Sequence, residues 1–287
     1  MGAWRPQFRN DRSFTFGKQP DKHAMFEGCP PTSALVVQYR VEPYLRNPDE
    51  PSQLDQNFID LHTLVSEITL VLTLIGPRVP LHVANWFNFD DPDLECAQLG
   101  RSRGTQIVEI LPRMSFAAAP VLDAAEAQRT IAQFQGLQPL AKKKVITATS
   151  RLKHGLSRHH AGDQAVELSI ALETLVGDAA NAEMTHKVSV RAVRMLGGPP
   201  DVRARNLAIL KRTYDVRSKV VHQGEQASGT VTVASEKMTV DALMTEAACL
   251  CAELIKVVIK RGSVPSWGHF DINESASMTA VSSTGVD

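Results

Sequence analysis

The stretch YDVRSKVVHQGE (214–225) places an arginine, Arg217, and a histidine, His222, five positions apart. An imidazole has an unperturbed pKa of about 6.5, so it can accept or donate a proton near neutral pH. A guanidinium stays protonated, and its planar set of N–H donors pairs with carboxylate or phosphate oxygens. The two side chains could therefore act together on an anionic group, or they could form a buried structural pair that ties the last helices together.

The spacing alone does not decide between these readings. With 19 arginines and 9 histidines in 287 positions, a histidine five positions after an arginine is expected about 0.6 times by chance, and the three spacings from five to seven positions together about twice. Five positions on an ideal helix also rotate a side chain by about 500°, which leaves the two residues about 140° apart. Either the helix ends between them, as Gly224 suggests, or the arginine of one copy of the chain meets the histidine of another.

Two kinds of segment surround this stretch. In the first half, the segments 34–43, 79–89 and 105–111 have the composition of strands, and an apolar stripe predicts one long helix between the first two. The stripe is typical of a core helix or of a homodimer seam. Its members alternate by four and three positions: Leu54, Phe58, Leu61, Val65, Ile68, Leu72 and Ile75.

From about residue 121 the sequence becomes a succession of amphipathic helices with short connections, which is typical of a helical bundle. After a short candidate in AAEAQRTIAQFQG, the predicted helices are 140–158, 163–177, 184–198, 200–222 and 240–262.

The predicted fold class is α+β and mainly α. Residues 1–33 are expected to be a loosely structured lead-in and 34–137 a smaller mixed α/β module. A helical bundle follows over 138–264, and 265–287 is expected to be a flexible tail.

Composition narrows the class of protein. Hydrophobic residues make up 43% of the chain and charged residues 22%, as in an ordinary soluble protein with a buried core. Lysine plus arginine and aspartate plus glutamate both number 31, so a surface for nucleic acid would have to be a local patch. The four cysteines form no CxxC pair, and no apolar segment is long enough to cross a bilayer. A cytoplasmic protein with reduced thiols is expected.

Motifs for cofactors and metals give no positive signal. The sequence contains no phosphate-binding P-loop, no GxGxxG and no HExxH or cysteine/histidine zinc spacing. His154, His159, His160 and Asp163 lie close together in sequence, but exposed histidines at helix ends explain them better than a metal site. Neither a cofactor nor a metal is predicted.

The order of three segments carries a resemblance to a known family. DQAVELSIALETLVG (163–177), VSVRAVRMLGG (188–198) and YDVRSKVVHQGE (214–225) follow one another inside the predicted bundle. This pattern resembles the HEPN superfamily (higher eukaryotes and prokaryotes nucleotide-binding), in particular its Apea-like branch, over roughly residues 138–262. Many members are metal-independent endoribonucleases that act as toxins, phage-defence effectors or RNA processors. They are typically dimers with both arginine–histidine signatures at the interface.

The resemblance implies that Arg217 and His222 form the catalytic pair and that RNA is the substrate. The mechanism would push the 2′-hydroxyl onto the adjacent phosphorus, with His222 as acid and base and Arg217 stabilising charge on the phosphoryl oxygens. DNA, which lacks the 2′-hydroxyl, would be spared.

Neighbouring residues receive roles on the same basis. Ser218, Lys219 and Arg212 are expected to bind substrate. Lys219, Arg212 and Lys211 could hold flanking phosphates, or they could be ordinary solvated charges of the helix. Glu173, from the IALE core, and Tyr214 are possible auxiliary residues. Glu173 could face a cation of the site or form an ion pair inside the bundle.

The resemblance therefore predicts a metal-independent endoribonuclease, acting as a homodimer with its site at the interface. The alternative is a non-catalytic HEPN module that binds RNA, a nucleotide or a protein partner through the same cleft. A further hypothesis makes the N-terminal module the sensor of a regulatory partner or trigger that controls the bundle.

Overall fold

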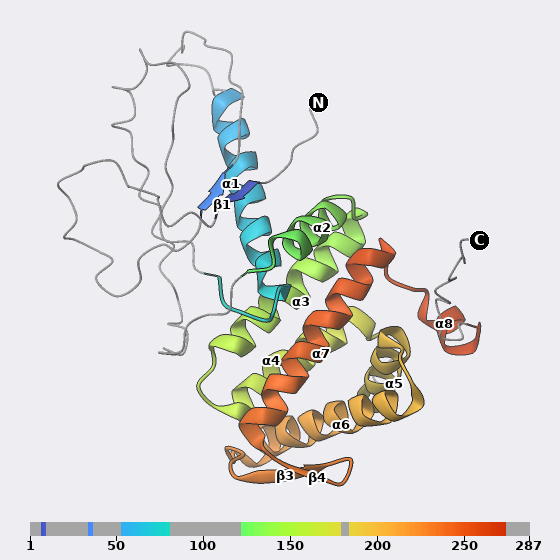
Figure 1. Cartoon of the computed structure of the whole chain (residues 1–287). Helices are drawn as coiled ribbons and strands as arrows, with labels where there is room; N and C mark the ends of the chain where they lie inside the picture. Colours follow the sequence, from blue (N-terminus) through green and yellow to red (C-terminus); the bar gives the residue numbers. More distant parts are fainter. Residues whose placement is uncertain (1–6, 10–33, 37–52, 81–121, 179–183, 274–287) are drawn as a thin grey trace, which may run out of the picture. The chain divides into compact units, whose positions relative to one another are not determined.

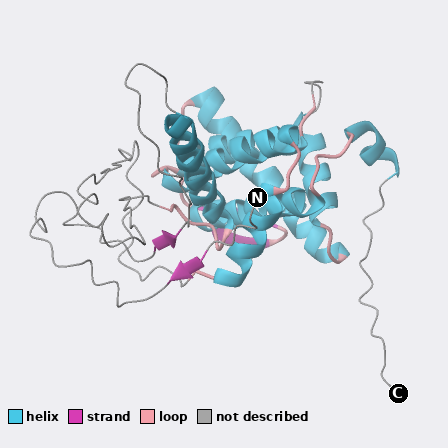
Figure 2. Cartoon of the chain, turned by 90° about the horizontal axis from the view of Figure 1, so that it is seen from above, coloured by secondary structure: helices cyan, strands magenta, loops and turns pink. Residues whose placement is uncertain are grey.

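The computed structural model describes residues 7–9, 34–36, 53–80, 122–178 and 184–273 (Figure 1). The chain divides into two compact units. One comprises Met1–His62 with His82–Ile107, and the other comprises Thr63–Leu81 with Val108–Asp287. The described residues are mostly helical (Figure 2), as the mainly α prediction requires.

The first described elements of the chain are two short strands, one long helix and a 3₁₀ turn. Strand β1 (Gln7–Arg9) pairs antiparallel with β2 (Ala34–Val36), and Phe8 lies opposite Leu35. Helix α1 (Gln53–Val71) spans the boundary between the two units and continues into a 3₁₀ turn, η1 (Leu72–Leu74). The strand predicted over 34–43 is confirmed at its first three residues. The strands predicted over 79–89 and 105–111 lie outside the described residues, apart from 79–80.

The second unit is a helical bundle with one hairpin. Its elements after η1 are α2 (Ala124–Gln135), α3 (Pro139–Ser157), α4 (Ala161–Val176), α5 (Met184–Leu196), α6 (Pro200–Gln223), β3 (Thr230–Val233), β4 (Glu236–Thr239), α7 (Val240–Arg261) and α8 (Trp267–Asn273). Helices α3 to α7 match the five predicted helices closely. The hairpin and α8 were not predicted.

Local signals set the limits of these helices. The carboxylate of Asp123 accepts the backbone N–H of Glu126 at 2.9 Å at the start of α2, and the hydroxyl of Thr239 accepts that of Ala242 at 3.1 Å at the start of α7. Helices α6 and α7 each end at a glycine in the left-handed region, Gly224 with φ +68° and Gly262 with φ +79°.

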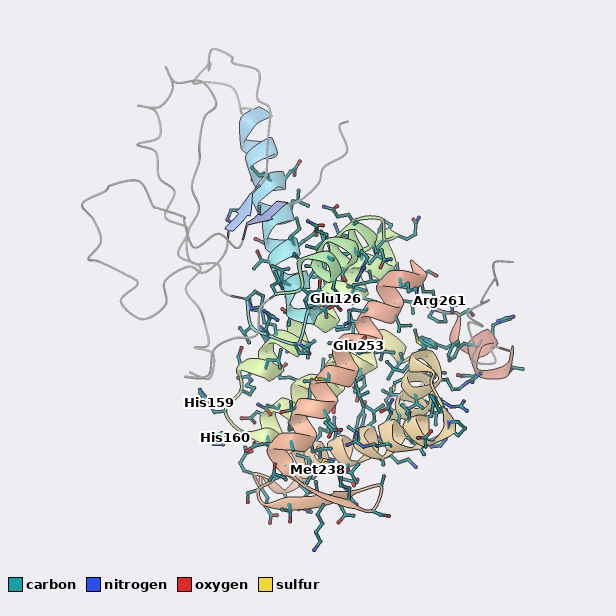
Figure 3. All side chains as sticks on the ribbon, in the orientation of Figure 1. Glu126, His159, His160, Met238, Glu253 and Arg261 are labelled. Atoms are coloured by element: carbon teal, nitrogen blue, oxygen red, sulfur yellow. The ribbon has the colours of Figure 1, made fainter. Side chains whose placement is uncertain are left out.

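Helix α7 lies at the centre of the bundle. It contacts α2, α3, α4, α5 and α6, and in Figure 1 it crosses α3 and α4. Its apolar side chains, among them Leu243, Leu254 and Ile255, are fully buried. Helix α2 is held to α7 by an ion pair between Glu126 and Lys256 at 2.7 Å; Figure 3 labels Glu126. Because α2 and η1 both pack on α7, they belong to the same compact unit as the helices predicted over 138–264.

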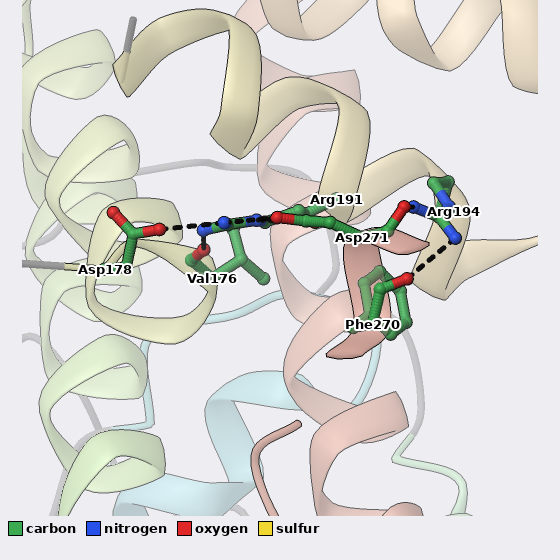
Figure 4. Close-up of polar contacts among 6 residues, drawn as sticks. All are labelled: Val176, Asp178, Arg191, Arg194, Phe270 and Asp271. Atoms are coloured by element: carbon green, nitrogen blue, oxygen red, sulfur yellow. Dashed lines mark hydrogen bonds and ion pairs between the residues drawn. The ribbon is translucent and has the colours of Figure 1, made fainter. Parts of the chain in front are cut away.

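Helix α8 is held by a buried arginine (Figure 4). The Arg191 side chain on α5 is only 4% exposed and donates to Asp271 of α8 at 2.6 Å and to Asp178 at 2.8 Å. It also donates to the carbonyl oxygen of Val176 at 3.0 Å, and its guanidinium lies 5.0 Å from the ring centre of Trp267. Two carboxylates, a carbonyl and an aromatic face thus compensate the burial of one cation.

Candidate functional site

Helix α6 carries both residues of the arginine–histidine pair. It runs without interruption from Pro200 to Gln223, and the backbone N–H of Gly224 closes it by donating to the carbonyl of Val220 at 3.0 Å. The helix therefore does not end between Arg217 and His222, and that sequence-based alternative is wrong. On a regular helix the two side chains leave the axis about 140° apart, with an axial rise of about 7.5 Å between them.

Arg217 belongs to the inner face of α6. It follows the buried Tyr214 by three positions and the buried Thr213 by four, so the three residues share one side of the helix. Arg217 itself is half-buried. Burial raises the pKa of Tyr214, and the positive charge of Arg217 opposes that rise.

Two contacts with α4 bracket Arg217. Near the end of α6, Val220 lies against Gly162 in the first turn of α4, so closely that a Cβ atom at Gly162 would come within 2.1 Å of the valine side chain. Further back, the Tyr214 hydroxyl donates to Glu173 Oε1 at 3.3 Å. Helices α4 and α6 are therefore antiparallel neighbours, and Arg217 lies between the two contacts along α6.

Tyr214 and Glu173 form the inner part of this region. Burial raises the pKa of Tyr214, and the nearby charge of Glu173 raises it further. The phenol consequently stays protonated and acts as a hydrogen-bond donor to the carboxylate. This bond gives Glu173 a structural partner inside the bundle.

His222 belongs to the opposite, solvent-exposed face. It follows Lys219 by three positions, Ser218 by four and Asp215 by seven, and all four residues are exposed. The same face continues back along the helix through Lys211, which precedes His222 by eleven positions. One copy of the chain thus presents His222 to solvent on a polar face and holds Arg217 at the edge of the bundle.

Arg212 lies at the junction of this polar face with the hairpin. Its Nε donates to the carbonyl of Thr232 on β3 at 3.3 Å, and its Nη1 pairs with Asp215 at 3.0 Å. The guanidinium is thus held in a defined position. Its partner Asp215, three positions further along the same helix, also balances its charge.

A groove of about 880 Å³ opens beside Arg212. Residues from α5, α6 and the hairpin line it: Met184, Thr185, His186, Ala208, Lys211, Arg212, Asp215, Thr232 and Ala234. Sequence reasoning did not find this groove, because its walls come from three elements and one of them, the hairpin, was not predicted.

A second polar cluster lies where α3 meets α4. Glu167, 5% exposed, accepts hydrogen bonds from Arg158 at 2.6 Å and from Arg151 at 3.2 Å. Burial alone would raise the pKa of Glu167, but these two bonds and the charges of the arginines outweigh burial, and the net shift is downward. His159 and His160 lie at this connection (Figure 3). Among the described residues, no group of three or more histidine, cysteine, aspartate or glutamate side chains could hold a metal ion.

Comparison with known proteins adds no assignment. No protein-family model, no curated protein and no solved structure matches this chain. Within the described part of the chain, no helix is both long enough and apolar enough to cross a membrane.

Proposed function

We propose that this protein is a metal-independent endoribonuclease of the HEPN type that acts as a homodimer. Arg217 of one copy and His222 of the other act on the same phosphodiester. The observation that carries the proposal is the unbroken course of α6 through both residues. The two side chains leave one helix about 140° apart, so a shared phosphate requires a second copy of the helix.

The exposure of the two residues supports this arrangement. His222 is exposed and Arg217 is half-buried, so neither is enclosed in the core. Val221 lies between them on the helix surface and is 50% exposed, which leaves an apolar side chain in water at the end of α6. An apolar contact between two copies at Val221 would place Arg217 of one copy and His222 of the other at the rim of one interface.

The chemistry follows from the residue types. The His222 imidazole accepts the proton of the 2′-hydroxyl as the 2′-oxygen bonds to phosphorus, and the bond from phosphorus to the 5′-oxygen breaks. The imidazolium then returns a proton to the departing 5′-oxygen, which leaves a 2′,3′-cyclic phosphate and a 5′-hydroxyl. Arg217 stabilises the charge on the phosphoryl oxygens, while Ser218 and Lys219, beside His222, contact the neighbouring sugar-phosphate groups.

The second candidate function is a non-catalytic HEPN module that binds RNA or a protein partner through the same surface. The observation that favours it is that the half-buried Arg217 shares the inner side of α6 with Tyr214, which donates a hydrogen bond to Glu173. In that case Arg217 stabilises the contact of α4 with α6, and His222 has no acid–base role.

The test uses purified protein, total RNA and EDTA, with Arg217→Ala and His222→Ala as the variants. Loss of cleavage in both variants is expected, while wild-type cleavage persists in EDTA. Arg205→Ala, a partly buried arginine of the same helix paired with Glu246, and His269→Ala, an exposed histidine of α8, are the matched controls. Cleavage that survives both site substitutions, or that needs a metal, refutes the mechanism; binding without cleavage favours the second candidate.

A mixture of the two inactive variants tests the composite site. A mixed dimer has one dead site and one intact site, because each variant supplies the residue that the other lacks. After subunit exchange at equal concentrations, activity should return to about a quarter of the wild-type value. If both residues acted from the same copy, no mixture would recover activity.

A further inference from the structure

The groove between α5, α6 and the hairpin has features of a binding site for an anionic group. Lys211 of α6 and His186 of α5 both line the groove, and both side chains are exposed. Within the described part of the chain, Lys211 forms no ion pair. Asp215 also lines the groove, but its carboxylate is already paired with Arg212. The positive charge of Lys211 is therefore not balanced inside the groove.

The third basic residue of the groove is prepared for a ligand. Arg212 uses Nε on the carbonyl of Thr232 and Nη1 on Asp215. These bonds fix the guanidinium plane, and they leave its Nη2 donors available. A phosphate oxygen between Arg212 and Lys211 would receive donors from a fixed guanidinium and a flexible ammonium, which together bind phosphate well.

Lys211, in the groove, and His222 lie on the same side of α6. Lys211 and His222 are eleven positions apart on one unbroken helix, which is about three turns. They therefore lie on nearly the same line, about 20° apart in angle and about 16 Å apart along the axis. Lys219 and Ser218, both exposed, lie between them on the same face. A single strand following this face would cover roughly two to three nucleotides from the groove to His222.

We propose that this groove is a second phosphate subsite for single-stranded RNA, which binds the backbone two to three nucleotides from the phosphate at His222. The inference rests on the proposed function, since it takes RNA as the ligand and His222 as the other end of the track. A volume of about 880 Å³ suits one nucleotide unit with its phosphate. The strand is held by its phosphates, so the subsite adds affinity without reading the base.

The test measures binding without cleavage. Fluorescently labelled 2′-O-methyl oligouridylates of two to eight nucleotides lack the attacking hydroxyl, and their affinities for the full chain can be followed by anisotropy at several salt concentrations. Wild-type affinity should rise when the oligomer becomes long enough to reach from His222 to the groove, at about four nucleotides. Lys211→Ala should remove that gain, lower the affinity for long oligomers about tenfold and reduce the salt slope by about 0.7.

Control variants make the result specific. Lys211→Arg should retain the gain in affinity, and Lys260→Ala, which removes an exposed lysine at the end of α7, should behave like the wild type. The subsite does not exist if Lys211→Ala and Lys260→Ala bind oligomers of every length with the same affinity, or if no oligomer binds. The nuclease proposal is scored separately by cleavage: if RNA is cleaved but binding does not depend on Lys211, the subsite alone is refuted. Length-dependent binding through Lys211 without cleavage refutes the nuclease and retains the subsite.

Discussion

The contact between Gly162 and Val220 makes a sharp prediction about the end of α6. A Cβ atom at Gly162 would lie 2.1 Å from Val220 Cγ2 and 2.8 Å from Gln226 Oε1. The glutamine can rotate away, but a valine in a helix has one strongly preferred χ1 rotamer and cannot. Gly162→Ala must therefore push the first turn of α4 away from the last turns of α6.

The magnitude follows from a matched glycine. Overpacking lowers the free energy of unfolding by about 1–3 kcal/mol, whereas replacing glycine by alanine within a helix raises it by up to about 1 kcal/mol. Gly155→Ala in α3 gains the same helix propensity without a clash. A Cβ atom at Gly155 would lie 3.5 Å from Glu167 Cβ, which is an ordinary contact. The free energy of unfolding of Gly162→Ala should therefore lie about 1–3 kcal/mol below that of Gly155→Ala.

Urea unfolding followed by circular dichroism at 222 nm measures the difference. Adding Val220→Ala removes the clashing methyl groups, so the cost of Gly162→Ala should be smaller in that background than in the wild type. Cleavage by Gly162→Ala should also fall, because the segment that carries Arg217 and His222 is displaced. Equal stability of the Gly162 and Gly155 variants, or additive effects of Gly162→Ala and Val220→Ala, would refute the packing of α4 against α6.

Three further outcomes are expected. The hydrogen bond from Arg191 lowers the pKa of Asp271. The stability that this pair contributes is therefore present above the unfolded pKa of about 3.9 and is lost as pH falls through the lower native value. Tryptophan fluorescence should report release of α8 in acid, and in the Asp271→Asn variant α8 should already be released at neutral pH. Ala234 and Ser235 form the hairpin turn with φ of 47° and 72°, so replacing them with Asn and Gly should stabilise the protein by about 1 kcal/mol in thermal unfolding, and no gain would argue against this turn. Burial raises the pKa of the Cys251 thiol to about 12, so this cysteine should resist a maleimide at pH 8 until the protein is unfolded, and rapid labelling of the native protein would contradict its place in the core.

Most helices of the bundle could be predicted from local sequence. Apolar periodicity gave the course of α3 to α7, and Gly262 marked the end of α7. The hairpin was missed because its turn is Ala-Ser, without the asparagine and glycine that usually signal such a turn. Helix α8 was missed because it has seven residues, and its main anchor, Arg191, lies 80 positions earlier in the chain. A contact of that separation leaves no local periodic signal.

For the candidate site, the sequence by itself identified Arg217 and His222 and showed that a regular helix cannot bring them to one face. Only the structure decided that the helix continues through both residues, to an end at Gly224 in the left-handed region. It also decided which residue faces inward, and it joined His186 of α5 with Lys211 of α6 in one groove. Such a juxtaposition depends on the packing of separate helices, and a one-dimensional pattern does not encode it.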